Sequence, residues 1–258
     1  MERILNSHCP VIGRTLESVK IHVSEDLYTP SHFLFASNLA MLQEVYDRLF
    51  AAFGPQHWWP GQTPFEVMIG AVLVQNTSWK NVERAIESLR VEGMLEPHAL
   101  YALEDETLET LIRPAGYFRI KARRLRNLLR LVVQQYDGSL EAMFSTNPST
   151  LREELLSVNG IGPETADSIL LYAGAIPKFV VDTYTHRVFA RHGWVEFEID
   201  YHGLQDYFES RLEADAVLYN EYHALLVRVG HLYCRKTPKC KDCPLDDLLP
   251  EGGPLTPD

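Results

Sequence analysis

A neutral glycine turn and an aspartate about 20 residues beyond it are the residues of this sequence best suited to chemistry. The turn, Gly160-Ile161-Gly162, separates two helical segments, and glycine permits positive φ and a close approach of the backbone. A helix beginning at Pro163 offers unpaired amides that favour a phosphate, so an uncharged turn can grip a nucleic-acid backbone without reading bases. A simple tight joint is the alternative. Asp182 follows Phe179-Val180-Val181 and enters a further helix, where an aspartate is typically the N-cap.

Three of the four cysteines lie close together near the C-terminus. Cys234, Cys240 and Cys243 have the spacing Cys-x5-Cys-x2-Cys, whereas Cys9 lies far away in the chain. In an intracellular protein this spacing indicates a metal before a disulfide.

The charge of the chain is segregated along the sequence. The formal net charge is −11, which by itself disfavours a polyanionic partner, yet binding depends on the local field. Residues 114–130 carry six basic side chains and no acidic one, whereas residues 196–221 are strongly acidic. The basic segment is compatible with nucleic-acid binding and equally with a solvated helix face.

The elements that must position these residues are mostly helical. Leu125, Leu128, Leu129 and Val132 recur at helical spacing and predict an amphipathic helix over 119–136. Thr150 and Glu153 have the spacing of a capping box. Further helices are expected in four other segments: 65–73, 78–89, 104–112 and from Pro163 to about Tyr172. Only Thr15–Val23 alternates like a strand.

Length and composition are those of a globular protein. The chain has 258 residues, 46% of them apolar, and no apolar run approaches the 18 or so residues of a membrane span. Its first residues lack the apolar core of a secretion signal. We therefore expect no membrane association and a cytoplasmic location, in the nucleoid if DNA is the partner.

Four motifs in this order resemble the helix-hairpin-helix DNA glycosylases of the endonuclease III superfamily. They are Gly-Ala-Val-Leu-Val-Gln-Asn-Thr at 70–77, Gly-Tyr-Phe-Arg-Ile-Lys-Ala at 116–122, Gly-Ile-Gly with Thr165-Ala166, and Val-Asp-Thr at 181–183 followed by Arg187-Val188. The resemblance covers roughly residues 40 to 245. It implies an all-α, two-lobed fold with DNA in the cleft between lobes. The implied parts are an N-terminal extension (1–34), a terminal helical lobe (35–57 and 175–258) and a six-helix lobe ending in the helix-hairpin-helix (58–174).

The same resemblance assigns roles to individual residues. It places Asp182 at the mouth of the cleft as the catalytic carboxylate, which stabilises the oxocarbenium-like sugar and orients water once the nucleotide is flipped out. Gln75 and Tyr117 would fill the space left by the base, although the first can instead cap a helix and the second can be a core aromatic. The implied DNA-binding residues are Gln75, Tyr117, Lys121, Gly160, Gly162 and Thr165.

One departure bears on the reaction type. Bifunctional members carry a lysine two residues after the second glycine, whose amine forms a Schiff base with the sugar, and here Glu164 stands there. We therefore predict a monofunctional glycosylase that acts on double-stranded DNA containing a damaged base, as a monomer. A catalytically inactive DNA-damage-binding homologue is the alternative of another class.

Further similarity to the endonuclease III-like 3-methyladenine DNA glycosylases suggests the substrate. Trp59, Pro60 and Trp79 match positions that sandwich an alkylated base there, and we add Glu164 to the expected base pocket. A methylated purine is cationic and gains about 0.5–2 kcal/mol against aromatic faces. Thr183 departs from the lysine of some members, so a glycosylase for oxidised or mismatched pyrimidines stays open.

The resemblance also implies a cofactor for the cysteines. The family binds a [4Fe–4S] cluster through Cys-x6-Cys-x2-Cys-x5-Cys. Cys234, Cys240 and Cys243 match three of these ligands, and Leu249 falls at the fourth position. Cys9, Asp246 or Asp247 can supply the missing ligand, and an empty, degenerate site is the alternative.

Overall fold

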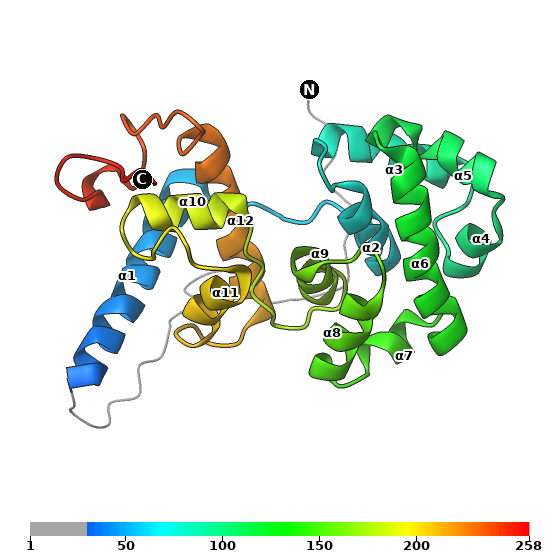
Figure 1. Ribbon diagram of the computed structural model, residues 1–258, viewed down its shortest axis with the longest axis horizontal. Helices are drawn as coiled ribbons and strands as arrows, with labels where there is room; N and C mark the ends of the chain where they lie inside the picture. The colour runs from blue at the N-terminus through cyan, green and yellow to red at the C-terminus, as the bar shows by residue number, and fades with distance from the viewer. Residues whose placement is uncertain (1–29, 258) are drawn as a thin grey trace. The chain divides into compact units, whose positions relative to one another are not determined.

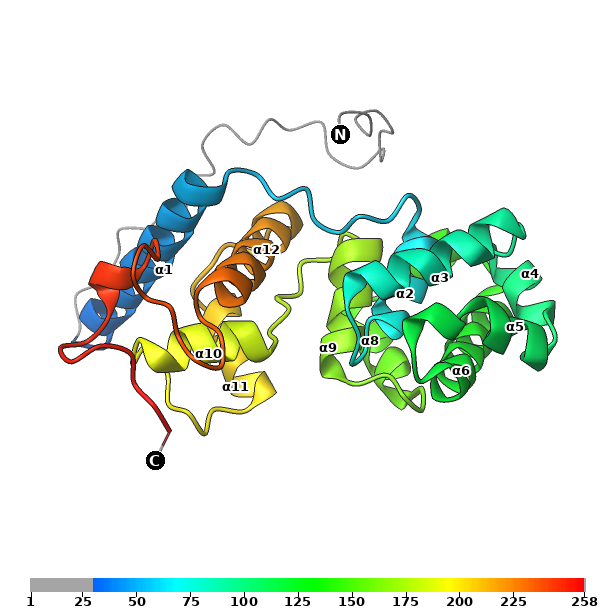
Figure 2. The same ribbon diagram turned by 90° about the horizontal axis from the view of Figure 1, so that it is seen from above.

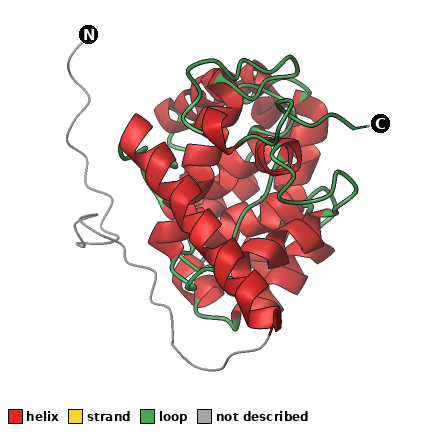
Figure 3. Ribbon diagram, turned by 90° about the vertical axis from the view of Figure 1, so that its left-hand side faces the viewer, coloured by secondary structure: helices red, strands yellow, loops and turns green. Residues whose placement is uncertain are grey.

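The computed structural model describes residues 30–257, and these residues form helices, turns and loops without a strand (Figure 3). The expectation of an all-α fold is confirmed for this part of the chain. The strand considered at Thr15–Val23 lies outside the described residues, as does most of the expected N-terminal extension. No described helix is both long and apolar enough to cross a membrane.

The described chain divides into two compact units (Figure 1). The first unit contains residues 59–176, and the second contains residues 30–58 together with 177–257. The helices of the first unit are α2 (Pro64–Leu73), α3 (Trp79–Val91), α4 (Pro97–Ala102), α5 (Asp105–Leu111), η1 (Arg113–Ala115), α6 (Phe118–Tyr136), α7 (Leu140–Phe144), α8 (Pro148–Ser157), α9 (Pro163–Ser168) and the π-helical turn η2 (Ile169–Ala173). Those of the second unit are α1 (Pro30–Phe53), α10 (Thr183–Arg191), α11 (Tyr201–Glu209), α12 (Ala216–Leu232) and η3 (Asp246–Leu248).

The first unit is built around α2, the most apolar helix of its core. Thr63 caps this helix by accepting a hydrogen bond from the Glu66 amide at 3.1 Å, and Pro64 occupies the first helical position. Every residue from Phe65 to Leu73 is buried. The amphipathic helix α6 packs Leu125, Leu129 and their neighbours into the same core, as its period predicts.

The first unit has eight α-helices where the sequence predicts six. The two additional helices, α4 and α7, contain six and five residues, so neither is long enough to display a hydrophobic period. The start of α8 also differs from the capping box expected at Thr150. Asn147 is the N-cap, and its Oδ1 accepts hydrogen bonds from the amides of Ser149 and Thr150, with Pro148 at the first helical position.

The second unit is held together by aromatic packing. Phe179 stacks on Phe208 with ring centroids 4.1 Å apart, and Tyr222 meets both rings edge-on. The hydroxyl of Tyr222 donates a hydrogen bond to the carbonyl of Leu42, which ties α12 to α1. The two helices lie side by side in Figure 2, and α10 also packs against α12. This core therefore fixes α10, the helix that Asp182 begins.

Candidate active site

The hairpin turn between α8 and α9 has two glycines with different requirements. Gly160 has a φ of +100°, and a Cβ added there would lie 2.3 Å from Cγ of Arg124. Gly162 is the extended N-cap of α9, is exposed, and has open space where a Cβ would be. Only Gly160 is thus dictated by the fold of the unit, whereas the room at Gly162 leaves its backbone accessible.

Gln75 joins the end of α2 to this hairpin. Its Nε2 donates hydrogen bonds to the carbonyl of Gly160 at 3.2 Å and to Oγ1 of Thr165 at 2.9 Å. Nη1 of Arg124 donates to Oε1 of Gln75 at 2.5 Å. The structure therefore brings together three of the predicted DNA-binding residues, Gln75, Gly160 and Thr165. It uses the amide of Gln75 and the buried hydroxyl of Thr165 inside the unit, and it adds Arg124, which sequence reasoning did not single out.

Lys121 lies inside the first unit, which corrects its assignment as a DNA-contacting residue. It is 1% exposed, and its Nζ donates hydrogen bonds of 2.8 Å to the carbonyls of Leu73 and Ala115. Burial and, to a smaller extent, the charge of Arg124 together lower the pKa of its amine to about 8. Its role in this structure is to satisfy the carbonyl ends of two helical segments.

The basic stretch of α6 does not form one solvated face. Arg126 turns inward and donates to the carbonyls of residues 100, 101 and 103, besides pairing with Asp105 at 2.8 Å. Arg119, Arg123 and Arg130 remain exposed. The cationic surface of this helix is consequently smaller than its sequence predicts.

Tyr117 stands at the start of α6 with its side chain 69% exposed. Gly116 and Tyr117 both have positive φ, 69° and 46°, a conformation that is rare for a tyrosine. The guanidinium groups of Arg113 and Arg119 lie 4.9 and 5.3 Å from the ring centroid of the next residue, Phe118. Its exposure shows that Tyr117 is not a core aromatic, and its role as a wedge stays a prediction.

Trp59, Trp79 and Tyr172 form an aromatic cluster, and its two tryptophans lie against Gly70 of α2. Trp59 meets Trp79 edge-on with centroids 5.0 Å apart and lies 5.1 Å from Tyr172 at an interplanar angle of 31°. A Cβ at Gly70 would come within 3.3 Å of both tryptophans, so the glycine admits the rings. Two rings in direct edge-to-face contact leave no room for a base between them. The expected sandwich between Trp59 and Trp79 is therefore not formed in this structure.

The other members of the predicted base pocket lie at the surface of the first unit. Pro60 and Glu164 are exposed, and Glu164 lies in the first turn of α9. Tyr172, which sequence reasoning did not include, belongs to the π-helical turn η2. The expected α-helical period does not predict its position, because a π turn changes which side chains share a face.

The two carboxylate oxygens of Asp182 have different partners. Oδ1 accepts hydrogen bonds from the amides of Tyr184 and Thr185, at 2.9 and 2.8 Å, and from Oγ1 of Thr185 at 3.1 Å. It is thus the N-cap of α10, as its position predicts. Oδ2 lies 3.7 Å from Nε2 of His223 on α12. Burial raises the pKa of Asp182, but His223 and the donors of Thr185 outweigh it, so the pKa lies below its usual value.

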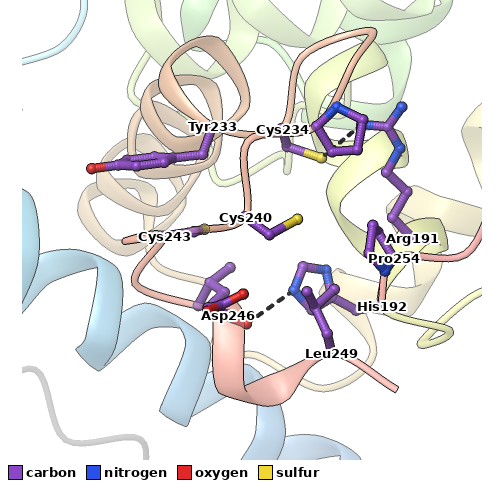
Figure 4. Close-up of a pocket in the computed structure, with 11 residues that line it drawn as sticks. Arg191, His192, Tyr233, Cys234, Cys240, Cys243, Asp246, Leu249 and Pro254 are labelled. Carbon is purple, nitrogen blue, oxygen red and sulfur yellow. Dashed lines mark hydrogen bonds between the residues drawn. The ribbon is translucent and has the colours of Figure 1, made fainter. Parts of the chain in front are cut away.

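The three C-terminal cysteines line a common, partly open cavity (Figure 4). Leu249 and Asp246 line it too, together with Arg191 and His192 of the α10 region. Burial raises the pKa of Cys243 to about 11 and also raises that of Cys240. Within residues 30–257 no three His, Cys, Asp or Glu side chains are grouped so as to hold a single metal ion.

The loop that carries these cysteines is anchored on α10. Nε of Arg187 donates to the carbonyl of Cys234 at 2.5 Å, and Nη1 of Arg191 donates to its Sγ at 3.4 Å. Arg191 also donates to the carbonyls of Arg235 and Lys236. One helix therefore begins at Asp182 and supports the cysteine loop along its later turns.

Comparison with protein families gives a match over residues 69–214 to the model described as HhH-GPD superfamily base excision DNA repair protein. The chain belongs to this superfamily. It is 46% identical over 210 residues to a Methanocaldococcus jannaschii protein named as a DNA repair glycosylase, with 81% of this chain and 95% of that protein covered. This HhH-GPD chain is accordingly a DNA N-glycosylase of base excision repair.

Two solved structures resemble the chain as well. The 3-methyladenine DNA glycosylase of H. pylori bound to 1,N6-ethenoadenine has a TM-score of 0.64 and 29% identity, covering 75% of this chain and 97% of that one. Endonuclease III in a trapped covalent intermediate with DNA has a TM-score of 0.71 and 25% identity, with coverages of 83% and 96%. The predicted resemblance to the endonuclease III superfamily is confirmed.

Proposed function

We propose that this glycosylase is monofunctional and releases an alkylated purine such as 3-methyladenine from double-stranded DNA, acting as a monomer. The observation that carries the reaction type is Glu164, which is exposed in the first turn of α9 at the position where bifunctional relatives carry a lysine. A carboxylate cannot form an imine with the sugar. Lys121 does not replace the missing amine, because it is buried and donates to two carbonyls.

Asp182 is the proposed catalytic carboxylate. The bond between C1′ and the base nitrogen breaks, and the electron pair leaves with the base. The sugar becomes oxocarbenium-like, and a carboxylate stabilises this positive charge. Water then adds its oxygen to C1′ and gives up a proton, so the products are the free base and an abasic site. The lowered pKa of Asp182 supports the role, because the group must be ionised to stabilise a cation.

The aromatic cluster supports a cationic base as substrate. Trp59, Trp79 and Tyr172 gather three electron-rich rings in one cluster, and a methylated purine on such a ring gains about 0.5–2 kcal/mol. Because the two tryptophans touch, we infer that the base stacks against the cluster and not between its tryptophans. The H. pylori relative is a 3-methyladenine glycosylase whose structure holds a modified adenine, which agrees with this substrate class.

A panel of duplexes, each with one lesion, tests the proposal when the released bases are identified by mass. We expect 3-methyladenine release by the wild type, none by D182N, and DNA binding by D182N within several-fold of wild type. Borohydride should trap no protein on the DNA. Release of thymine glycol or uracil without 3-methyladenine would instead favour an endonuclease III-type activity. The similarity to endonuclease III supports this alternative. A wild type that binds lesions and releases nothing would overturn both.

We infer further that Cys234, Cys240 and Cys243 hold a [4Fe–4S] cluster. Three thiols around one cavity fit such a group, because each cysteine of a cluster binds a different iron and no single-ion geometry is needed. The cluster, when bound, supplies a redox-active metal centre with soft ligands. The raised thiol pKa values mean that binding must displace protons, so assembly should improve with rising pH.

Asp246 is the proposed fourth ligand. It lines the cavity, whereas Asp247 pairs with Arg48 of α1 at 2.5 Å. Iron and sulfide analysis of anaerobically purified protein, with its visible absorption, tests the assignment. C240S should lose the cluster, D246N should lose iron on exposure to air, and D247N should behave as wild type. Colourless, iron-free wild-type protein would contradict the cluster, and C9S losing iron in place of D246N would contradict the ligand.

A further inference from the structure

The two oxygens of Asp182 are unequally available. Oδ1 already accepts three hydrogen bonds from Tyr184 and Thr185, which exhausts its useful acceptor directions. Oδ2 is therefore the oxygen that is available to contact a sugar or a water molecule. The side chain that faces Oδ2 among the described residues is His223, at 3.7 Å.

The packing of α12 on α10 holds His223 at this place. Gly230 lies seven residues after His223 and so on the same face of α12. A Cβ at Gly230 would lie 2.6 Å from the ring and 2.7 Å from Cβ of Tyr184, the second residue of α10. The absence of a side chain at Gly230 thus lets the two helices approach closely, and His223 is carried against the start of α10.

Burial strengthens the electrostatic interaction between His223 and Asp182. The side chains of His223 and Asp182 are 6% and 13% exposed, so water screens their interaction weakly. The other printed contacts of Asp182 are hydrogen bonds from the uncharged donors of Tyr184 and Thr185. Without His223, desolvation would act on a carboxylate supported only from the Oδ1 side.

We propose that His223 is a positioning residue for the glycosylase reaction, which orients Oδ2 of Asp182. The inference rests on the proposed function, in which Asp182 meets the sugar. His223 does not touch the reacting atoms in this assignment. It acts through Asp182, because it fixes the direction of Oδ2 while Oδ1 caps α10.

The test compares H223Q with H231Q, a matched change at an exposed histidine of the same helix. Single-turnover base release from the lesion duplex is measured from acidic to alkaline pH, together with DNA affinity and melting temperature. We expect H223Q to slow release about tenfold to a hundredfold and to move the acid limb of the profile to higher pH. H231Q should match the wild type, and the affinity of both for DNA should stay within about twofold. Imidazole added to H223A should restore part of the rate.

Each contrary result has a definite meaning. An H223Q profile that superimposes on the wild type overturns the inference alone, provided that D182N is inert. An active D182N overturns the proposed function and the inference with it. If His223 variants do not fold, NMR of the histidine rings in D182N replaces them. Loss of the carboxylate should change the chemical shift of the His223 Nε2 relative to the wild type at a fixed pH, and an unchanged shift refutes the pairing.

Discussion

Arg152 and Asp167 form a two-point ion pair across the helix-hairpin-helix, with distances of 2.7 Å from Nε to Oδ1 and 3.0 Å from Nη2 to Oδ2. Arg152 belongs to α8 and Asp167 to α9, so the pair joins the two helices on either side of the glycine turn. The carboxylate is completely buried and the guanidinium is 19% exposed. The geometry of the turn therefore depends on a charge pair beneath it as well as on its glycines.

Removal of this carboxylate should destabilise the protein strongly. Breaking a buried ion pair by deleting one partner costs about 3–5 kcal/mol, since the other charge is left uncompensated. We expect D167A to lower the free energy of unfolding by that amount in urea denaturation. E153A, at an exposed position of α8, is the matched control and should stay close to wild type. Equal stability of the two variants would show that the pair contributes little.

The two glycines of the turn should respond differently to alanine. G160A combines a φ of +100° with a Cβ 2.3 Å from Arg124, so we expect it to lose about 1–3 kcal/mol of stability. G162A meets open space at ordinary φ and should fold like wild type. If the backbone at Gly162 approaches a DNA phosphate, G162A will still bind DNA more weakly, as fluorescence anisotropy can measure. Wild-type affinity in G162A would exclude that approach.

Lys121 should make stability increase at alkaline pH. Its pKa of about 8 in the folded protein lies below the usual value of 10.5, so the unfolded chain binds more protons between these values. The burial penalty on its charge is present below pH 8 and is relieved as pH rises through this window. We expect the free energy of unfolding of wild type, relative to K121M, to increase from about pH 8 to about pH 10.5.

The exposed Lys80 provides the control for this measurement. K80M should follow the wild type across the whole pH range. A constant difference between wild type and K121M would contradict the lowered pKa of Lys121.

A thiol at Leu249 should strengthen cluster binding. Leu249 lines the cysteine cavity, so L249C adds a fourth sulfur at a position that already faces the proposed site. We expect L249C to keep its visible absorption longer than wild type on exposure to air. L248C alters the adjacent residue, which does not line the cavity, and should gain nothing. Equal decay in all three proteins would contradict a cluster held by this cavity.

The sequence predicts the helices of this fold well where their apolar residues recur over several turns. The apolar period of α6 and the uninterrupted apolar run of α2 both predict helices, and Asp182 is typical of the N-cap at which α10 begins. The short helices α4 and α7 were missed because five or six residues carry no period. The cap of α8 was misplaced because Asn147-Pro148 offers an earlier and complete start.

The site was harder to predict because side chains from distant segments compete for the same partners. Lys121 and Arg126 lie in a basic run, and only their contacts with carbonyls reveal that they turn inward. Trp59 and Trp79 were identified as aromatic residues of the site, but their edge-to-face contact depends on Gly70. His223 gave no signal, because nothing in local spacing connects it with a carboxylate 41 residues earlier.

Because η2 is a π-helical turn, the membership of Tyr172 in the aromatic cluster depends on one extra residue in this turn. Five residues, Ile169–Ala173, occupy this wider turn. Shortening it by one residue would restore a regular α-helix and rotate the side chains beyond the deletion by about 100°. The Tyr172 ring would swing away from Trp59 while every side chain of the cluster kept its chemical identity. Insertion or deletion at η2, with no substitution at all, is thus a route by which related enzymes can acquire a different stacking surface.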